Sequence, residues 1–169
     1  MKYLGTKSAG EDLANQDDVG GSIPAYALFQ NSASGNTTAI AATELTLTLT
    51  TEKEDTQNLF SLSANVVTAA AGADGRKFRV TQGSYMNLSA STRSEYMSWF
   101  FQGGVKNSFS KAVYYLRGYD SGMSEDGFDV VTISDGDTFE LKAGRTEGNG
   151  TTCYQDNSGT FLEFTEILT

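Results

Sequence analysis

Apolar residues recur at every second position through most of the chain, in short runs separated by glycine-containing breaks. The pattern is clearest in three runs after residue 125, at 126–133, 134–145 and 157–168. A period of two between tight turns is typical of half-buried antiparallel strands. The breaks fall at Asp126-Gly127, Asp135-Gly136, Gly148 to Gly150 and Ser158-Gly159. The residues predicted to share the inner face of each strand are Phe128 and Val130; Phe139, Leu141 and Ala143; and Leu162 and Phe164.

The first part of the chain carries six more runs of this kind. Further strands are predicted over 25–32, 39–50, 59–70, 77–90, 95–104 and 111–122, with a polar loop over 51–58. The residues expected to share one face within a strand are Leu45, Leu47 and Leu49; Phe60, Leu62, Ala64 and Val66; and Phe78 and Val80. No segment has a helical period of 3.6. Nine or ten strands of this length predict an all-β domain, built as two packed antiparallel sheets or a closed barrel.

Two of the predicted strands contain adjacent aromatic residues, Trp99-Phe100-Phe101 and Tyr114-Tyr115. Neighbouring strand residues point to opposite faces of a sheet, so only one of each pair can enter the core. A large exposed apolar patch would lower solubility. We therefore expect the outer aromatic residues to meet another subunit, in preference to forming a stacking platform for a carbohydrate.

Residues 1–22 show neither period and end in Gly20-Gly21-Ser22. Their few apolar residues include Tyr3, Leu4 and Leu13. Two interpretations stay open: a frayed terminus, or a docking peptide that orders on a partner. The predicted organisation is an N-terminal arm over 1–22 followed by one domain over 23–169.

Charge and composition narrow the choice of partners. The chain has 169 residues, a net charge of −9 and no histidine, and its pI is about 4.4. Phosphate backbones and anionic membrane surfaces are bound through Lys and Arg, so neither nucleic acid nor such a membrane is an expected partner. There is no apolar run of the ~18 residues that a spanning helix needs, and no apolar stretch near residue 1 that resembles a signal peptide.

The side chains offer little catalytic chemistry. Without histidine, the usual Ser-His-Asp and Cys-His arrangements are absent, and the single Cys153 is expected to be a buried spectator. No phosphate-binding glycine motif occurs. No catalytic residue, cofactor or metal site is therefore predicted.

Carboxylates are the one catalytic option left, because a pair of Asp or Glu can hydrolyse glycosides. The two acidic clusters are Glu125, Asp126 and Asp129, and Asp135, Asp137 and Glu140. Both lie beside Asp-Gly turns, where Asp is favoured for local hydrogen bonding, so a role in the turns is expected. The segment 134–140 is not an EF-hand loop, and a calcium ion held between loops stays an open alternative.

Three segments carry a family resemblance: 60–85, 130–145 and 158–168. Gly136-Asp137-Thr138-Phe139-Glu140-Leu141 and Gly159-Thr160-Phe161-Leu162-Glu163-Phe164 resemble the last strands of the C1q and tumour-necrosis-factor jelly-roll knobs, in the versions found in bacteriophage virion proteins. Residues 25–169 resemble this domain as a whole. The chain departs from the family at 75–80, where Gly75-Arg76-Lys77-Phe78-Arg79-Val80 is one residue longer than the usual strand and lacks its tyrosine.

The resemblance implies a homotrimer, with the apolar residues of one sheet packed around a three-fold axis, and no catalysis. We expect a non-enzymatic virion structural protein on the virion surface, a trimeric decoration or cement protein of a capsid. Its arm would bind the major capsid protein or another virion protein through Tyr3, Leu4 and Leu13. Residues Trp99, Phe101, Tyr115 and Phe164 are expected at the trimer interface or in the core.

Three alternatives differ in what they require. A receptor- or glycan-binding module of a tail fibre or spike needs a groove with aromatic and carboxylate groups. A jelly-roll glycosidase needs two carboxylates about 5–10 Å apart in a cleft. A soluble signalling ligand is disfavoured by the missing signal peptide and disulfides.

Overall fold

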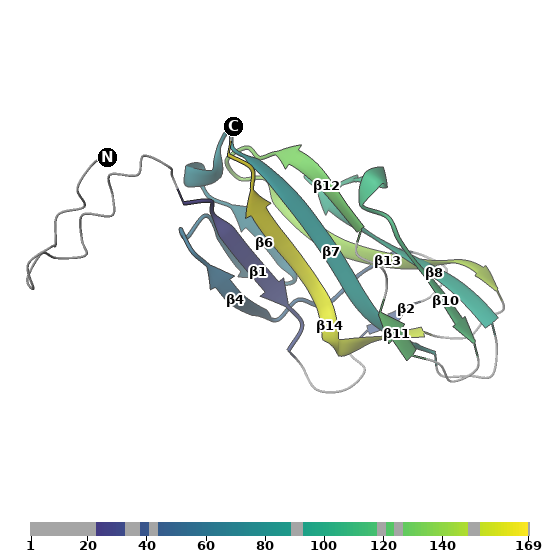
Figure 1. Ribbon diagram of the computed structural model, residues 1–169. Helices are drawn as coiled ribbons and strands as arrows, with labels where there is room; N and C mark the ends of the chain where they lie inside the picture. The colour runs from purple at the N-terminus through teal and green to yellow at the C-terminus, as the bar shows by residue number, and fades with distance from the viewer. Residues whose placement is uncertain are drawn as a thin grey trace, which may run out of the picture.

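The computed structural model consists mainly of two antiparallel β-sheets packed face to face (Figure 1). It describes residues 23–32, 38–40, 44–88, 93–117, 121–123, 127–148 and 153–168. The only helices in these ranges are two short 3-10 turns, η2 (Ala71–Ala73) and η3 (Ser108–Ser110). The predicted all-β, antiparallel jelly-roll sandwich is confirmed. Residues 1–22, with Tyr3, Leu4 and Leu13, lie outside the described residues.

The first sheet has the strand order β11-β7-β14-β1-β4, with β12 also paired to β7 and β2 also paired to β14. Its strands are β1 (Tyr26–Gln30), β2 (Thr38–Ile40), β4 (Thr51–Asp55), β7 (Lys77–Leu88), β11 (Ser121–Met123), β12 (Gly127–Thr132) and β14 (Cys153–Glu166). The last strand of the chain therefore lies in the middle of the sheet, between the first strand and β7.

The second sheet has the order β10-β8-β13-β6-β5, with β3 beside β13 and β9 beside β8. Its strands are β3 (Leu45–Thr46), β5 (Phe60–Ser63), β6 (Val66–Ala69), β8 (Arg93–Gln102), β9 (Val105–Lys106), β10 (Ala112–Arg117) and β13 (Thr138–Gly148). Neighbours along the chain often lie in different sheets, so the two sheets cannot form independently of each other.

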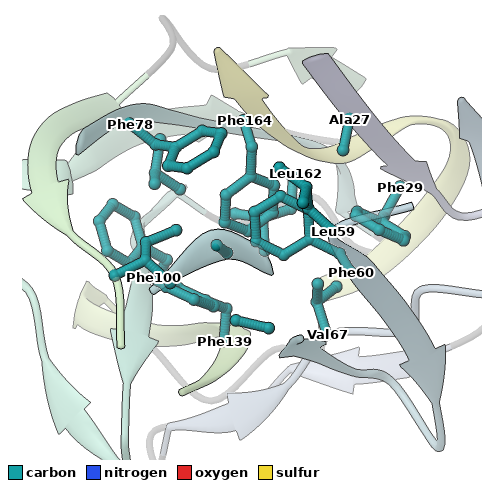
Figure 2. Packing of buried hydrophobic residues seen from close by; sticks show 14 of the residues in the cluster. Ala27, Phe29, Leu59, Phe60, Val67, Phe78, Phe100, Phe139, Leu162 and Phe164 are labelled. Carbon is teal, nitrogen blue, oxygen red and sulfur yellow. The ribbon is translucent and has the colours of Figure 1, made fainter. Parts of the chain in front are cut away.

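The larger of two hydrophobic clusters is built on phenylalanine (Figure 2). The Phe164 ring is at its centre: it stacks on Phe60 at a centroid distance of 4.3 Å and meets Phe139 edge-on at 5.0 Å. Phe29 meets Phe164 edge-on as well, at 6.1 Å. Such pairs add about 0.5–1.5 kcal/mol each beyond the burial of apolar area. The second cluster includes Ile40, Leu47, Met86, Tyr96, Leu141 and the buried Cys153.

A buried polar bridge joins the two sheets. Gln82 of β7 donates through Nε2 to the Ser110 carbonyl (2.8 Å) and accepts from the Ser98 hydroxyl (3.0 Å). The Ser84 hydroxyl is hydrogen-bonded to the Tyr114 hydroxyl of β10. Because each of these buried groups has a partner, the bridge avoids the cost of buried unsatisfied polar atoms and holds the sheets in one alignment.

Several predicted inner faces are confirmed. Phe78 and Val80 are fully buried, and so are Leu162 and Phe164. The same holds for Phe139, Leu141 and Ala143 of β13. These positions alternate with exposed or half-buried residues on strands that lie well inside a sheet, where a period of two reports burial directly.

For β12, the wrong face of the strand was predicted to be buried. Phe128 and Val130 are about half exposed, whereas Val131 packs against the core and Ile133 is fully buried. The register explains it: Phe128 pairs with Thr81 and Val130 with Arg79, which are the outward-facing positions of β7. Both faces of β12 carry apolar residues, so alternation alone could not choose between them.

One segment predicted as a single strand is a hairpin, and one segment predicted as a loop begins with an edge strand. Residues 59–70 form the β5–β6 hairpin, whose turn residues Ala64 and Asn65 have φ of 49° and 70°. Two adjacent positive φ values suit the tight turn of a two-residue hairpin. The segment 51–58 begins with strand β4, whose middle residues are exposed. β4 pairs with β1 at the sheet edge, and edge strands are typically charged, which made it resemble a loop.

The segments 39–50 and 157–168 were also predicted with the wrong limits. The first contains β2, β3 and residues 47–50, which are not in a strand; Leu47 and Leu49 are buried, whereas Leu45 in β3 is exposed. In the second, Ser158-Gly159 is no break: β14 runs through it with a register shift between Asp156 and Phe161. A bulge of this kind absorbs extra residues without ending a strand.

Candidate assembly surfaces

Phe128 and Val130 of β12 form a half-exposed apolar strip on the outer face of the first sheet, beside Arg79 of β7. We call these three residues the β12 strip. Phe128 and Val130 are 48% and 47% exposed. The guanidinium of Arg79 lies 4.1 Å from the centre of the Phe128 ring, a cation–π contact. Leu28 and Phe161 lie on the same face, because their neighbours Phe29 and Leu162 are buried in the core. Sequence reasoning missed this strip because it assigned Phe128 and Val130 to the core.

The outer face of the second sheet is covered differently. Trp99 and Phe101 are each only 8% exposed within a single chain. The ammonium group of Lys106 lies 4.0 Å from the centre of the Trp99 ring, and that of Lys142 lies 4.6 Å from the Phe101 ring. The two lysines are paired in turn, Lys106 with Glu44 and Lys142 with Glu140. Lysine side chains therefore cover the two aromatic residues that were expected to need another subunit.

Tyr115 is the exposed aromatic residue of β10, at 65%. Its neighbour Tyr114 is buried, as the opposite facing of adjacent strand residues requires. Tyr115 lies opposite Glu95 in the β8–β10 ladder. The pKa of Glu95 is lowered because its carboxylate accepts hydrogen bonds from Tyr115, which has the larger effect, and from Thr146. Both favour the charged form.

The four residues predicted for the interface or core do not form one surface. Phe164 lies in the centre of the core, whereas Trp99, Phe101 and Tyr115 lie on the outer face of the second sheet. Their part in a trimer interface stays a prediction.

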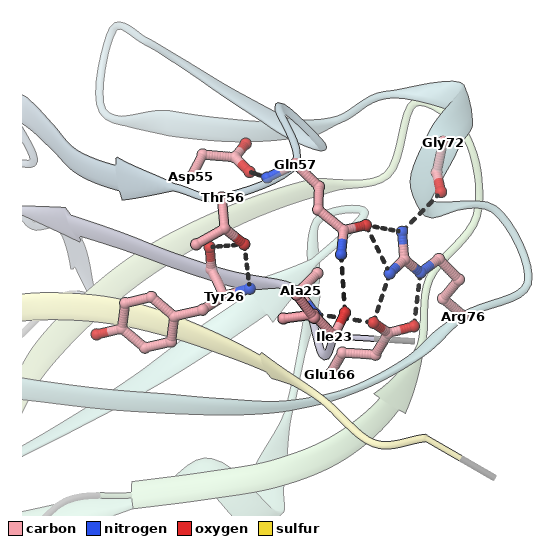
Figure 3. A network of polar contacts seen from close by, with 9 residues as sticks. All are labelled: Ile23, Ala25, Tyr26, Asp55, Thr56, Gln57, Gly72, Arg76 and Glu166. Atoms are coloured by element: carbon pink, nitrogen blue, oxygen red, sulfur yellow. Dashed lines mark hydrogen bonds and ion pairs between the residues drawn. The ribbon is translucent and has the colours of Figure 1, made fainter. Parts of the chain in front are cut away.

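A polar network lies where the described chain begins, next to the end of the last strand (Figure 3). The carboxylate of Glu166 accepts hydrogen bonds from Nε and Nη2 of Arg76, the former at 2.7 Å. The backbone N–H of Ala25 donates to the same carboxylate (2.9 Å). The pKa of Glu166 is lowered and that of Arg76 is raised, in both cases mainly by the hydrogen bonds between them. The two directions agree, as expected for a charge-assisted bidentate pair.

The described acidic side chains have roles in turns and ladders. Asp137 accepts from Nε2 of Gln102 (2.7 Å) and from the Ser134 N–H (2.9 Å), which closes the turn before β13. Asp129 accepts from Asn107 (2.7 Å). Glu125 and Asp126 lie outside the described residues. Asp137 thus has the role in a turn that the Asp-Gly sequence predicts, and Asp129 holds the residue that precedes η3.

The described part of the chain contains neither a cluster of metal ligands nor a helix that could span a membrane. No group of three or more His, Cys, Asp or Glu residues there is arranged to hold a metal ion. Its 3-10 turns are far too short to cross a bilayer, and it has no longer helix.

Comparison with known proteins finds similarity in structure alone. No family model matches the sequence, and no curated protein matches it. Murine APRIL, a member of the tumour-necrosis-factor family, superposes with TM-scores of 0.57 (crystals at pH 8.5) and 0.59 (pH 5.0), at 10% identity over 86% of this chain and all of that one. The globular domain of zebrafish complement 1qA protein gives 0.52, at 13% identity over 83% of this chain and 95% of that domain. At this identity the likeness concerns the fold: the chain has the jelly-roll sandwich of the C1q and tumour-necrosis-factor type.

Proposed function

We propose that this protein is a non-enzymatic virion structural protein, a homotrimeric knob on the virion surface that attaches through residues 1–22. The observation that carries the proposal is the β12 strip, an apolar strip left half exposed on the face of one sheet in a domain of the C1q and tumour-necrosis-factor type. An apolar sheet face of this kind is stabilised by burial against another subunit. The net charge of −9 would keep many copies soluble on one particle.

The trimer proposed here buries the β12 strip, in place of the outer face of the second sheet, where Trp99, Phe101 and Tyr115 were predicted to meet another subunit. Trp99 and Phe101 already have lysine side chains over their rings, so their burial does not depend on association. The same lysines leave little ring surface for a sugar to stack on. The covered rings therefore favour a structural role over the glycan-binding alternative.

The solution mass tests the trimer. The full chain is expected near 54 kDa by light scattering, three times 18.1 kDa. Phe128→Glu combined with Val130→Glu puts two carboxylates into the contact and is expected to weaken association at least ten-fold, because desolvating unpaired charge opposes interface formation. The mass of the variant should fall toward one chain at micromolar concentration, with an unchanged circular dichroism spectrum.

Tyr115→Gln is the matched control, because it alters an exposed aromatic residue on the other sheet. It should leave the trimer intact. A monomeric wild type would contradict the trimer. Dissociation by Tyr115→Gln, with the β12 double variant still trimeric, would move the interface to the second sheet.

The arm is tested by deletion. A chain lacking residues 1–22 should remain trimeric but bind purified particles that lack the protein at less than a tenth of full-length occupancy, because the anchoring side chains are gone. Alanine at Tyr3, Leu4 and Leu13 should have the same effect, and alanine at Lys2 and Lys7 should not. Occupancy is measured by gel densitometry of sedimented particles. Full occupancy by the truncated knob, or absence of the protein from native particles by antibody labelling, would contradict the proposal.

A further inference from the structure

We propose that Arg76, Gln57 and Glu166 form a clamp that holds the root of the N-terminal arm rigidly, so that the knob stands on its arm at a fixed joint. The clamp rests on the proposed function of residues 1–22 as an arm. Its existence as a local holding device can be tested on the isolated chain.

The backbone N–H and carbonyl of Ala25 are both hydrogen-bonded to Glu166. The Ala25 N–H donates to the Glu166 carboxylate (2.9 Å), and the Glu166 N–H donates to the Ala25 carbonyl (2.9 Å). Ala25 precedes β1, so these bonds extend the β1–β14 ladder beyond its last backbone pair, Tyr26 with Thr165. The first described residues are thus tied to the central strand of the sheet.

Gln57 adds a contact at Ile23, two residues closer to the N-terminus than Ala25. Its Nε2 donates to the Ile23 carbonyl (3.0 Å), and its Oε1 accepts from both terminal nitrogens of Arg76 (3.0 Å each). Arg76 also donates to the Gly72 carbonyl (3.3 Å). Every hydrogen-bonding nitrogen of this guanidinium is therefore used (Figure 3). The chain is bound at Ile23 and Ala25, one on each side of Pro24, whose ring already restricts the backbone.

The parts of the clamp come from segments far apart in the sequence: the start of β1, the turn after β4, the loop before β7 and the end of β14. Ala25 and Glu166 are separated by 141 positions, and Arg76 and Glu166 by 90. All four strands belong to the first sheet, so the clamp can close only after these distant parts of that sheet have come together.

The clamp also differs from the other two described ion pairs. Its side chains are 9% exposed at Glu166 and 24% at Arg76, and its contact is bidentate. The Lys106–Glu44 and Lys142–Glu140 pairs are each a single contact, and their carboxylates are more exposed than that of Glu166, at 35% and 24%. A bidentate pair with a nearly buried carboxylate holds its geometry better than a single lysine contact.

Apolar side chains lie around the clamp and point to solvent. Ile23 is 80% exposed although its carbonyl is held, and Ile167 and Leu168, which directly follow Glu166, are also exposed. A rigid joint keeps these three side chains at the end of the domain where the described chain begins.

Hydrogen exchange of single backbone amides in the full chain tests the clamp. Arg76→Gln is expected to speed exchange of the Ala25 and Tyr26 amides at least ten-fold, with less than a two-fold change for the amides of β7 from Val80 to Ser84. Gln57→Ala, which removes the Ile23 contact and the two Arg76–Gln57 hydrogen bonds but leaves the Arg76–Glu166 pair, should give a smaller increase at the same two amides. Lys142→Gln is the matched control, because it breaks an ion pair away from the arm, and it should change neither region.

The outcomes separate a local clamp from general stabilisation. If Arg76→Gln leaves the Ala25 and Tyr26 amides within two-fold of the wild type, no clamp exists. If it speeds β7 exchange equally, the pair stabilises the whole domain and the proposed local role is wrong. Should Arg76→Gln fail to fold, Glu166→Gln repeats the test with a smaller change in shape. Because no particle is used, failure of the arm in the deletion test leaves this result unaffected.

Discussion

Phe164→Ala is expected to lower the free energy of unfolding by about 3–5 kcal/mol. The Phe164 ring is fully buried and contacts the rings of Phe29, Phe60 and Phe139, which come from both sheets. Removing it leaves a cavity that three aromatic neighbours on different strands cannot fill by a small shift. The loss is a large part of the ~5–15 kcal/mol that a domain of this size has in total.

Urea denaturation followed by tryptophan fluorescence measures the loss, since Trp99 is the single tryptophan. Phe109→Ala is the control. Phe109 is 83% exposed on η3, and its removal should change stability by no more than about 0.5 kcal/mol. Equal effects of the two substitutions would show that the phenylalanine cluster is not the centre of the core. If the protein is trimeric, both variants are compared at one chain concentration, because association adds to apparent stability.

Gly127→Ala is the second substitution with a large expected effect. A Cβ atom at Gly127 would lie 2.7 Å from the Ser110 carbonyl carbon and 2.8 Å from Nε2 of Gln82. The added methyl group therefore separates the hydrogen-bonded groups at one end of the polar bridge. Overpacking and one buried unsatisfied amide together should cost about 2–4 kcal/mol.

Gly144→Ala provides the comparison, because this buried glycine also lies within a strand. Its Cβ would meet the Glu44 side chain at 3.3 Å, and that exposed side chain can move. We expect a loss below about 1 kcal/mol, measured by the same denaturation. A loss at Gly127 no larger than at Gly144 would mean that η3 and β12 separate easily and that the bridge contributes little.

The alternation of apolar and polar residues was sufficient to predict burial where a strand has one apolar face. β13 and the second half of β14 lie inside their sheets, and Phe139, Leu141, Leu162 and Phe164 are buried as alternation predicts. It was insufficient where both faces are apolar or where the strand lies at an edge. The inner and outer faces of β12 were exchanged, and the charged strand β4 was taken for a loop.

The candidate surfaces were predicted less well than the fold. Trp99 and Phe101 were predicted at the trimer interface or in the core. The lysines that cover their rings come from β9 and β13, and it is the pairing of these strands with β8 that brings them there. The β12 strip was missed because its exposure depends on the register with β7. The clamp was missed because Arg76, Gln57 and Glu166 have no spacing that relates them.

The amino-acid sequence by itself determined an all-β sandwich, the buried faces of several of its strands, the jelly-roll resemblance and the absence of histidine chemistry. These features follow from alternation, turn residues and composition, which act over a few residues. Only the tertiary structure decided which apolar residues stay exposed, which charges pair, and how the start of β1 is tied to the end of β14. Those outcomes depend on register and on contacts between residues about 90 to 140 positions apart, and such contacts exist only after distant segments of the chain have come together in the folded domain.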